Sequence, residues 1–183
     1  MKNVIFAGVG GQGVILASKI LMEAAMAAAR LGLSTLLITQ NVDRIGHLSC
    51  NPAIGGLAKG HMVREIDALG GMMGLWADAS GIQFRTLNTR KGPAVRATRA
   101  QIDREAYMRV VKRDIFAQDN LSVRQDTVEE VLADGGRAAG IRTGSGEVFA
   151  ARAVLLTTGT FLGGLIHIGL TRTRGGRLGD PPS

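Results

Sequence analysis

Apolar and polar positions in the first 40 residues define three segments. Residues 2–7 form a short apolar run that is typical of a buried strand, and residues 34–39 form another. Between them, residues 14–31 are rich in alanine, leucine and methionine, which favour a helix, and Gly32 ends this helical stretch. The order strand, helix, strand predicts a βαβ unit and therefore a parallel sheet.

The middle of the chain predicts helices separated by irregular segments. Residues 40–60 and 89–98 are interpreted as loops because glycine, proline and polar residues interrupt any apolar period. Residues 61–69, 72–79 and 103–118 are predicted to be helical. The apolar residues expected to anchor the last of these helices in the core are Ile102, Ala106, Val110 and Phe116.

Short strands separated by glycine turns are predicted in the last third of the chain. They form a small β-meander over about residues 121–151, with strands at 121–125, 128–133, 138–143 and 148–151. The strongly apolar residues 153–157 predict a buried parallel strand that returns to the first sheet. We therefore expect one α/β domain over residues 1–183, a Rossmann-like fold with an added meander.

Composition narrows the class of protein. Apolar residues make up 45% of the chain and charged residues 20%, which is typical of a globular protein, and a single cysteine excludes an internal disulfide. The formal charge of +7 suits a polyanionic partner, although many basic proteins bind none. Apolar runs are too short or too interrupted by charge to span a membrane, so we expect a cytoplasmic protein without membrane association.

The turn after the first predicted strand carries a candidate cofactor site. Gly8, Gly10 and Gly13 have the spacing GxGxxG, which allows a tight turn, a close backbone approach to a pyrophosphate and close helix packing. The N-terminus of the following helix offers free N–H groups to the anion. The candidate cofactor-binding residues of this turn are Gly8, Val9, Gly10, Gly11, Gln12 and Gly13.

The carboxylate that usually binds the ribose is missing at the end of the second predicted strand. Thr39 and Asn41 are neutral candidates for this role, and Asp43 lies slightly beyond them. Residues 153–160, an apolar strand that ends in small residues before a glycine, resemble the second dinucleotide-contact motif of flavoproteins.

Cys50 lies in a loop that glycines and Pro52 make rigid. It is either a reactive thiol or a small buried apolar residue, and Lys59 and His61 are candidates to lower its pKa. The three histidines show no metal-ligand spacing, so no metal site is expected.

Long segments from residue 23 onward resemble one family of flavoproteins. The chain is similar to the MnmG family of tRNA uridine 5-carboxymethylaminomethyl modification enzymes, also called glucose-inhibited division protein A. The segments that carry the resemblance are SCNPAIGG at 49–56, GHMVREIDALGG at 60–71, GIQFR at 81–85, KGPAVRATRAQ at 91–101 and GGRLGDPPS at 175–183.

The resemblance implies a glutathione-reductase-like FAD-binding fold and a reaction on tRNA. Enzymes of this family modify wobble uridine with FAD, NADH and methylenetetrahydrofolate, act with an MnmE-type GTPase and form homodimers. By position, FAD contacts fall on the glycine turn, Val128 and Ser183. Cys50 matches one of two functional cysteines, which either adds to C6 of the uracil ring or moves a proton.

Arginines around the Gly92–Pro93 loop are candidates for anion binding. Arg96 and Arg99 are the residues most suited to hold flavin phosphate, the folate glutamate or tRNA phosphate. The alternatives are a solvated basic loop, or arginines that are hydrogen-bonded to backbone and make the loop rigid.

Residues 1–22 depart from this pattern and instead resemble the start of the gamma subunit of 2-oxoacid:ferredoxin oxidoreductases. They make the first helix about eight residues longer, which adds about 12 Å and rotates its face by about 80°. We therefore expect weaker FAD binding than with the shorter helix.

The family continues well beyond residue 183, and its second cysteine, NADH-binding insertion and GTPase-contact region lie there. We therefore expect an N-terminal fragment, incomplete at its C-terminus, that does not turn over substrate alone. The alternatives are a folate- and FAD-dependent tRNA uracil methyltransferase paralogue, a 2-oxoacid oxidoreductase subunit and a non-catalytic basic nucleic-acid-binding fragment.

Overall fold

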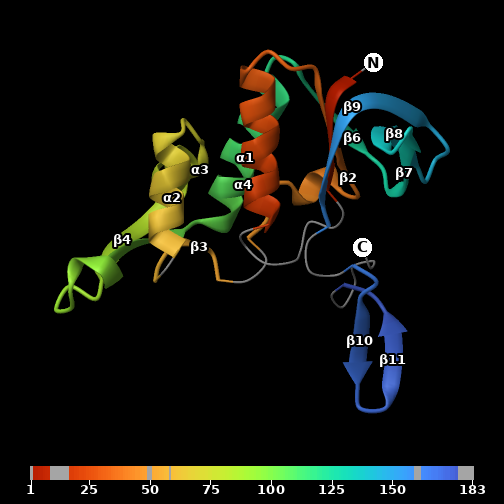
Figure 1. Cartoon of the computed structure of the whole chain (residues 1–183). Coiled ribbons are helices and arrows are strands. Elements are labelled where there is room, and N and C mark those ends of the chain that lie inside the picture. Colours follow the sequence, from red (N-terminus) through yellow and green to blue (C-terminus); the bar gives the residue numbers. More distant parts are fainter. Residues whose placement is uncertain (1, 9–16, 49–50, 58, 159–161, 177–183) are drawn as a thin grey trace.

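The first elements of the computed structural model form the predicted βαβ unit (Figure 1). β1 (Lys2–Gly8), α1 (Ala17–Arg30) and β2 (Thr35–Thr39) follow one another, and β1 pairs with β2 in parallel. The structure describes residues 2–8, 17–48, 51–57, 59–158 and 162–176.

A six-stranded sheet in the order β6-β2-β1-β9-β8-β7 forms the main part of the fold. β6 (Leu121–Gln125) and β9 (Val148–Thr157) extend its parallel part, whereas β7 (Val128–Asp134) and β8 (Arg137–Thr143) are antiparallel. β9 pairs with β8 near its start and with β1 over the rest of its length, so one continuous strand belongs to both parts. The predicted α/β, Rossmann-like fold class is confirmed.

The predicted extent of the β-meander is wrong at its start. β6 pairs in parallel with β2, and the meander consists of β7, β8 and the beginning of β9. The physical reason is the preceding helix α4 (Arg104–Ala117), because a crossover through a helix returns the chain parallel to the sheet. Leu121 and Val123, two residues apart on β6, accordingly pack against the main core.

Burial of the returning strand is also less complete than its composition indicates. Residues 153–157 do pair in parallel with β1, as predicted, but Leu155 and Leu156 are 42% and 53% exposed. An apolar sequence makes a strand suitable for burial, but the elements that pack on it decide how much of it is buried.

Side chains on the two faces of the parallel sheet enter two separate cores. Phe6 and Leu37 belong to the cluster beneath α1 and α4, and the neighbouring Ile5, Leu36 and Ile38 belong to a smaller cluster with the meander. This alternation follows from the period of two along a strand. Both faces are therefore covered, which the continuous apolar runs of the two strands indicate.

The core positions of α4 are shifted from those expected. Tyr107, Val111 and Ile115 are fully buried at a spacing of four, whereas Phe116 is 57% exposed and Ala106 and Val110 are half-buried. The sequence has apolar residues on both flanks of this stripe, and the packing against α3 (Met73–Ser80) and β6 selects the face. The expectation that Ile102 is buried is confirmed.

A three-stranded antiparallel sheet lies beside the helices α2 (Lys59–Ala68) and α3. Its order is β3-β5-β4, with β3 (Ala53–Gly55), β4 (Gly81–Leu87) and β5 (Ala97–Ile102). The prediction of a loop over residues 40–60 is therefore wrong in part, because it contains β3, the turn η1 (Val42–Arg44) and the start of α2. A hairpin of β10 (Leu165–Ile168) and β11 (Thr171–Arg174) follows later, and no described helix is long and apolar enough to cross a membrane.

Glu23 connects α1 to the start of α3. Its carboxylate accepts the backbone N–H of Met72 at 2.8 Å and that of Met73, and no side chain of α3 itself caps this helix end. Two helical turns further along α1, Arg30 donates to the carbonyl of Gly70 at 2.6 Å. Two side chains of α1 thus fix the turn between α2 and α3, and Glu23 acts as an N-cap supplied by another helix.

Burial raises the pKa of Glu23 above its ordinary value of 4.5, because desolvation outweighs the two backbone hydrogen bonds. The folded protein then holds the Glu23 proton more tightly than the unfolded chain. The Glu23 contribution to stability is therefore full below pH 4.5 and decreases as pH rises through the higher folded pKa.

We expect Glu23→Gln to remove this decrease, because the amide keeps an oxygen for Met72 N without the charge. Glu23→Ala should lower the unfolding free energy by about 1–2 kcal/mol at low pH, through loss of the cap, and by less as pH rises. Urea unfolding from pH 4 to 8 measures both effects. An identical pH slope in the wild type and Glu23→Gln would contradict the assignment.

Candidate functional site

The carboxyl ends of four neighbouring strands form one edge of the parallel sheet. Gly8 of β1 lies in register with Thr39 of β2 and Thr157 of β9, and Thr39 with Gln125 of β6. The chain passes from β1 outward to β2 and β6 and then returns to the other side of β1 as β9. The carboxyl end of β1 is therefore a topological switch point, where open α/β sheets bind ligands.

The three ribose candidates after β2 differ in which of their side-chain groups already bond within the protein. Thr39 is buried and donates its hydroxyl to the Asn41 carbonyl at 3.5 Å, and the Asp43 carboxylate lies 3.5 Å from Lys112 Nζ. Asn41 Oδ1 accepts the backbone N–H of Asp43 at 2.8 Å, which fixes the side chain of this exposed residue. Of the three ribose candidates, Asn41 is therefore the best suited, through its side-chain N–H groups.

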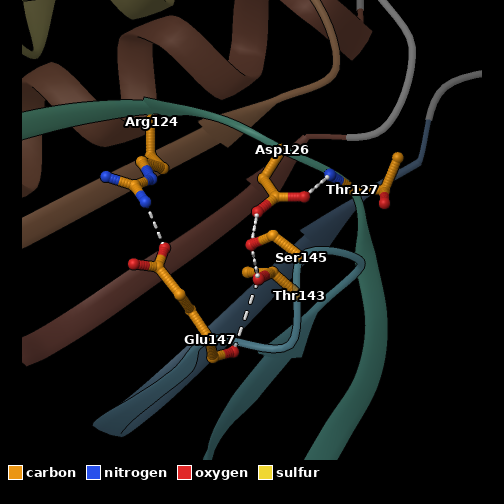
Figure 2. Close-up of polar contacts among 6 residues, drawn as sticks. All are labelled: Arg124, Asp126, Thr127, Thr143, Ser145 and Glu147. Atoms are coloured by element: carbon orange, nitrogen blue, oxygen red, sulfur yellow. Dashed lines mark hydrogen bonds and ion pairs between the residues drawn. The ribbon is translucent and has the colours of Figure 1, made fainter.

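A network of polar side chains holds the segment that follows β6 at this edge of the sheet (Figure 2). Asp126 accepts a hydrogen bond from the Ser145 hydroxyl at 2.5 Å and another from Thr127 N at 2.8 Å, while Thr143 Oγ1 lies 3.0 Å from Ser145 Oγ. An ion pair between Arg124 and Glu147 runs beside it. These contacts tie the turn between β8 and β9 to the connection between β6 and β7.

The hydrogen bond from Ser145 is the main cause that holds the pKa of Asp126 below its ordinary value of 3.8. The carboxylate therefore stays ionised at neutral pH and remains an acceptor. Val128 begins β7 two residues after Asp126 and is half-buried against the smaller core. The network thus fixes the backbone that leads into Val128, a predicted FAD contact.

The other predicted cofactor residues lie mostly outside the described residues. Gly8 is the last residue of β1, at the switch point. The predicted catalytic residue is also outside the described part of the chain. The predicted site residues that the structure does not describe are Val9, Gly10, Gly11, Gln12, Gly13, Cys50 and Ser183.

Arg96 and Arg99 occupy different positions on the β4–β5 hairpin. Arg96 follows the 3-10 turn η2 (Pro93–Val95), is exposed and donates from Nε to the Lys91 carbonyl at 3.2 Å. Arg99 is half-buried on β5, directly opposite Arg85 of β4. Arg96 and Arg99 therefore belong to the three-stranded sheet and its loop, whereas Gly8, Asn41 and Val128 lie on or beside the six-stranded sheet.

Sequence reasoning missed Glu23 and the Asp126–Ser145 pair. Glu23 is the only acidic residue among the first 42, and a lone carboxylate in an alanine-rich helix is a signal for a buried, bonded group. Asp126–Thr127 between two predicted strands is a turn signal. Its partner Ser145 lies 19 residues away, and only the fold brings the two together.

Comparison with solved structures shows strong similarity to one protein over the whole chain. GidA of Aquifex aeolicus, in two crystal forms, matches 100% of this chain with 47% identity and TM-scores of 0.89 and 0.90. This chain spans 29% of the length of GidA. The GidA-related protein from Thermus thermophilus shares the fold, with a TM-score of 0.55, 18% identity and coverage of 100% of this chain and 64% of its own.

More distant flavoproteins share the fold. PqsL of Pseudomonas aeruginosa, described as a probable FAD-dependent monooxygenase, matches 84% of this chain and 41% of its own, with a TM-score of 0.53 and 16% identity. A family model described as glucose inhibited division protein A matches residues 22–183, and so begins where the resemblance to the oxidoreductase gamma subunit ends. The chain therefore belongs to the glucose inhibited division protein A family.

Proposed function

We propose that this chain binds FAD and forms the flavin-binding part of a tRNA-modifying enzyme. The observation that carries the proposal is the topological switch point at Gly8, the last residue of β1. It occurs in a chain whose sequence is 47% identical to GidA over its whole length. When bound, the flavin would supply hydride transfer. The name of PqsL as a probable FAD-dependent monooxygenase on the same fold supports this cofactor.

The residues at the described edge fit the adenosine half of FAD. Asn41 has free N–H groups fixed in direction by its bond to Asp43 N, which suits ribose hydroxyls. The chain beside Val128 is held by the Asp126–Ser145 network and can present backbone groups to the adenine. We assign the pyrophosphate to the glycine turn after Gly8 on its sequence spacing.

The finer parts of the proposal come from the family. They are formation of the 5-carboxymethylaminomethyl group on wobble uridine, with NADH and methylenetetrahydrofolate as co-substrates and an MnmE-type GTPase and a second copy of the chain as partners. In this proposal Cys50 is the catalytic thiol and Ser183 a further FAD contact. The 2-oxoacid oxidoreductase alternative gains no support, since the family match covers residues 22–183.

The test is a fluorescence titration of the purified chain with FAD, FMN and riboflavin. FAD should bind more tightly than FMN or riboflavin, because the proposed contacts hold the adenosine diphosphate half. Asn41→Ala should weaken FAD binding about tenfold, the effect of one lost hydrogen bond. Asn41→Asp should retain binding, because one carboxylate oxygen keeps the bond to Asp43 N and the other accepts from a ribose hydroxyl, which can donate as well as accept.

Asn3→Ala, on β1 but away from this edge, serves as the matched control and should bind FAD like the wild type. Equal affinity for FAD and riboflavin would contradict the assignment of the adenosine half. No binding of any flavin at high micromolar concentration would contradict the proposed cofactor.

A further inference from the structure

The positive charge of the chain is concentrated in one hairpin. Residues 81–102, which form β4, its loop and β5, contain five cations and no acidic residue, and the whole chain has a formal charge of +7. The remaining residues therefore carry a net charge of only +2, from 7 minus 5. The five cations are Arg85, Arg90, Lys91, Arg96 and Arg99, and we call residues 81–102 the cationic hairpin.

Two arginines of the cationic hairpin lie side by side. The antiparallel register places Arg85 directly opposite Arg99, and Gln83 directly opposite Gln101, so all four project from one face. Gly55 is the neighbour of Arg99 on β3 and adds no side chain to this face. The tip of the hairpin lies away from the six-stranded sheet (Figure 1).

Like charges directly opposite each other on a sheet are destabilising. No carboxylate of the described residues forms an ion pair with any of the five cations of the hairpin. Elsewhere the same chain does pair cations, as in Arg142–Glu130 at 3.0 Å. A doubled, unneutralised arginine pair is the arrangement expected where an external anion supplies the missing charge.

The loop of the cationic hairpin is ordered by its own hydrogen bonds. Asn88 Nδ2 donates to the Val95 carbonyl at 3.2 Å across the loop, and Arg96 Nε donates to the Lys91 carbonyl at 3.2 Å. The second bond fixes the plane of the Arg96 guanidinium and leaves its two terminal nitrogens for a ligand. Less conformational entropy is then lost on binding, which favours a recognition surface over a loosely solvated loop.

The chemistry of the arginine face favours RNA over an acidic protein. Gln83 and Gln101 lie on one side of the two arginines, and the next pair on the same face, Leu87 and Ala97, is half-buried and buried. The described part of this face therefore exposes no large apolar side chain, whereas the exposed Phe84 belongs to the opposite face and lines a cavity with α2 and α3. Protein interfaces need an apolar or aromatic anchor at their centre, whereas nucleic-acid interfaces are polar and strongly positive. Arginine forks also match phosphate oxygens in pairs.

We propose that the cationic hairpin binds the phosphodiester backbone of RNA, with Arg85 and Arg99 as the central contacts and Arg96 as a preoriented third. This inference rests on the proposed function, since it places the RNA substrate on a defined surface of the chain. The surface is separate from the flavin edge, so each can be tested without the other.

The experiment measures binding of a fluorescein-labelled RNA stem-loop to the purified chain by anisotropy, over a range of KCl concentrations. Arg85→Gln/Arg99→Gln should weaken binding at least tenfold near 0.1 M salt. Its plot of log K against log salt should be shallower by about 1.4, which corresponds to two lost phosphate contacts in the single-stranded loop of the probe. The control Arg109→Gln/Arg137→Gln removes two exposed arginines from α4 and β8 and should change affinity less than twofold.

Polyglutamate serves as the competitor for an acidic-protein surface and should not displace the RNA. Equal losses in the two double variants, wild-type affinity in Arg85→Gln/Arg99→Gln, or displacement by polyglutamate would each overturn the proposal. Circular dichroism of both variants excludes loss of folding as the cause. A chain that binds RNA through this pair but binds no flavin would refute the cofactor and leave the RNA surface in place, and the reverse result would do the opposite.

Discussion

Trp76→Ala should lower the free energy of unfolding by about 3–5 kcal/mol, the range for deletion of a large aromatic side chain from a core. Trp76 is 1% exposed and packs edge-on against Tyr107, with ring centroids 6.4 Å apart and an interplanar angle of 84°. Its indole N–H donates to Asp114 Oδ2 at 2.8 Å. The substitution therefore removes packing between α3 and α4 and a hydrogen bond to a carboxylate.

Urea unfolding followed by circular dichroism measures this loss, since the chain has only one tryptophan and the variant lacks its fluorescence. Trp76→Phe keeps most of the apolar volume and should cost about 1–2 kcal/mol for the lost hydrogen bond. Leu75→Ala, one residue earlier and 56% exposed, is the matched control and should change stability by less than about 0.5 kcal/mol. A Trp76→Ala variant within about 1 kcal/mol of the wild type would show that this contact is not central to the core.

Gly55→Ala is expected to have the second large effect, a loss of about 3 kcal/mol or more. A Cβ at this position would lie 2.3 Å from the Thr98 carbonyl oxygen, and the backbone has φ of +80°. That same oxygen accepts the Gly56 N–H at 2.8 Å, so the clash also breaks the bond that joins the end of β3 to β5. Because Gly55 lies beside Arg99, the substitution should weaken RNA binding as well.

Two further glycines separate the causes of this effect in the same unfolding assay. Gly56 has φ of +101° with open space around it, so Gly56→Ala should show only the backbone strain of about 1–2 kcal/mol. Gly92 has a φ of −59° and open space, so Gly92→Ala should be nearly neutral. Equal stability of Gly55→Ala and Gly92→Ala would contradict the close approach of β3 to β5.

Local sequence patterns identified the elements whose apolar period is strong. The βαβ unit at the start, the helices α2, α3 and α4 and the parallel return of residues 153–157 follow from such patterns and are confirmed. Family membership likewise followed from contiguous segments such as KGPAVRATRAQ, because a motif in one stretch of chain needs no tertiary information to be recognised.

Other features depend on contacts between distant residues and escaped prediction. In β4, apolar Ile82 and Phe84 alternate with polar Gln83 and Arg85. This alternation is compatible with a strand, and the pairing with β5 shows that it is one. The buried face of α4 shifted to Tyr107, because α3 covers that side and not the side of Phe116.

The candidate sites show the same division. By itself the sequence determined the GxGxxG spacing that starts at Gly8, the absence of a carboxylate at the end of β2, the excess of positive charge and the presence of one cysteine. The tertiary structure decided that Asp43 pairs with Lys112 and leaves Asn41 available, that Ser145 holds Asp126, and that Arg85 lies opposite Arg99. The reason is that composition and spacing act along the chain, whereas hydrogen bonds, ion pairs and strand register join residues that only folding brings together.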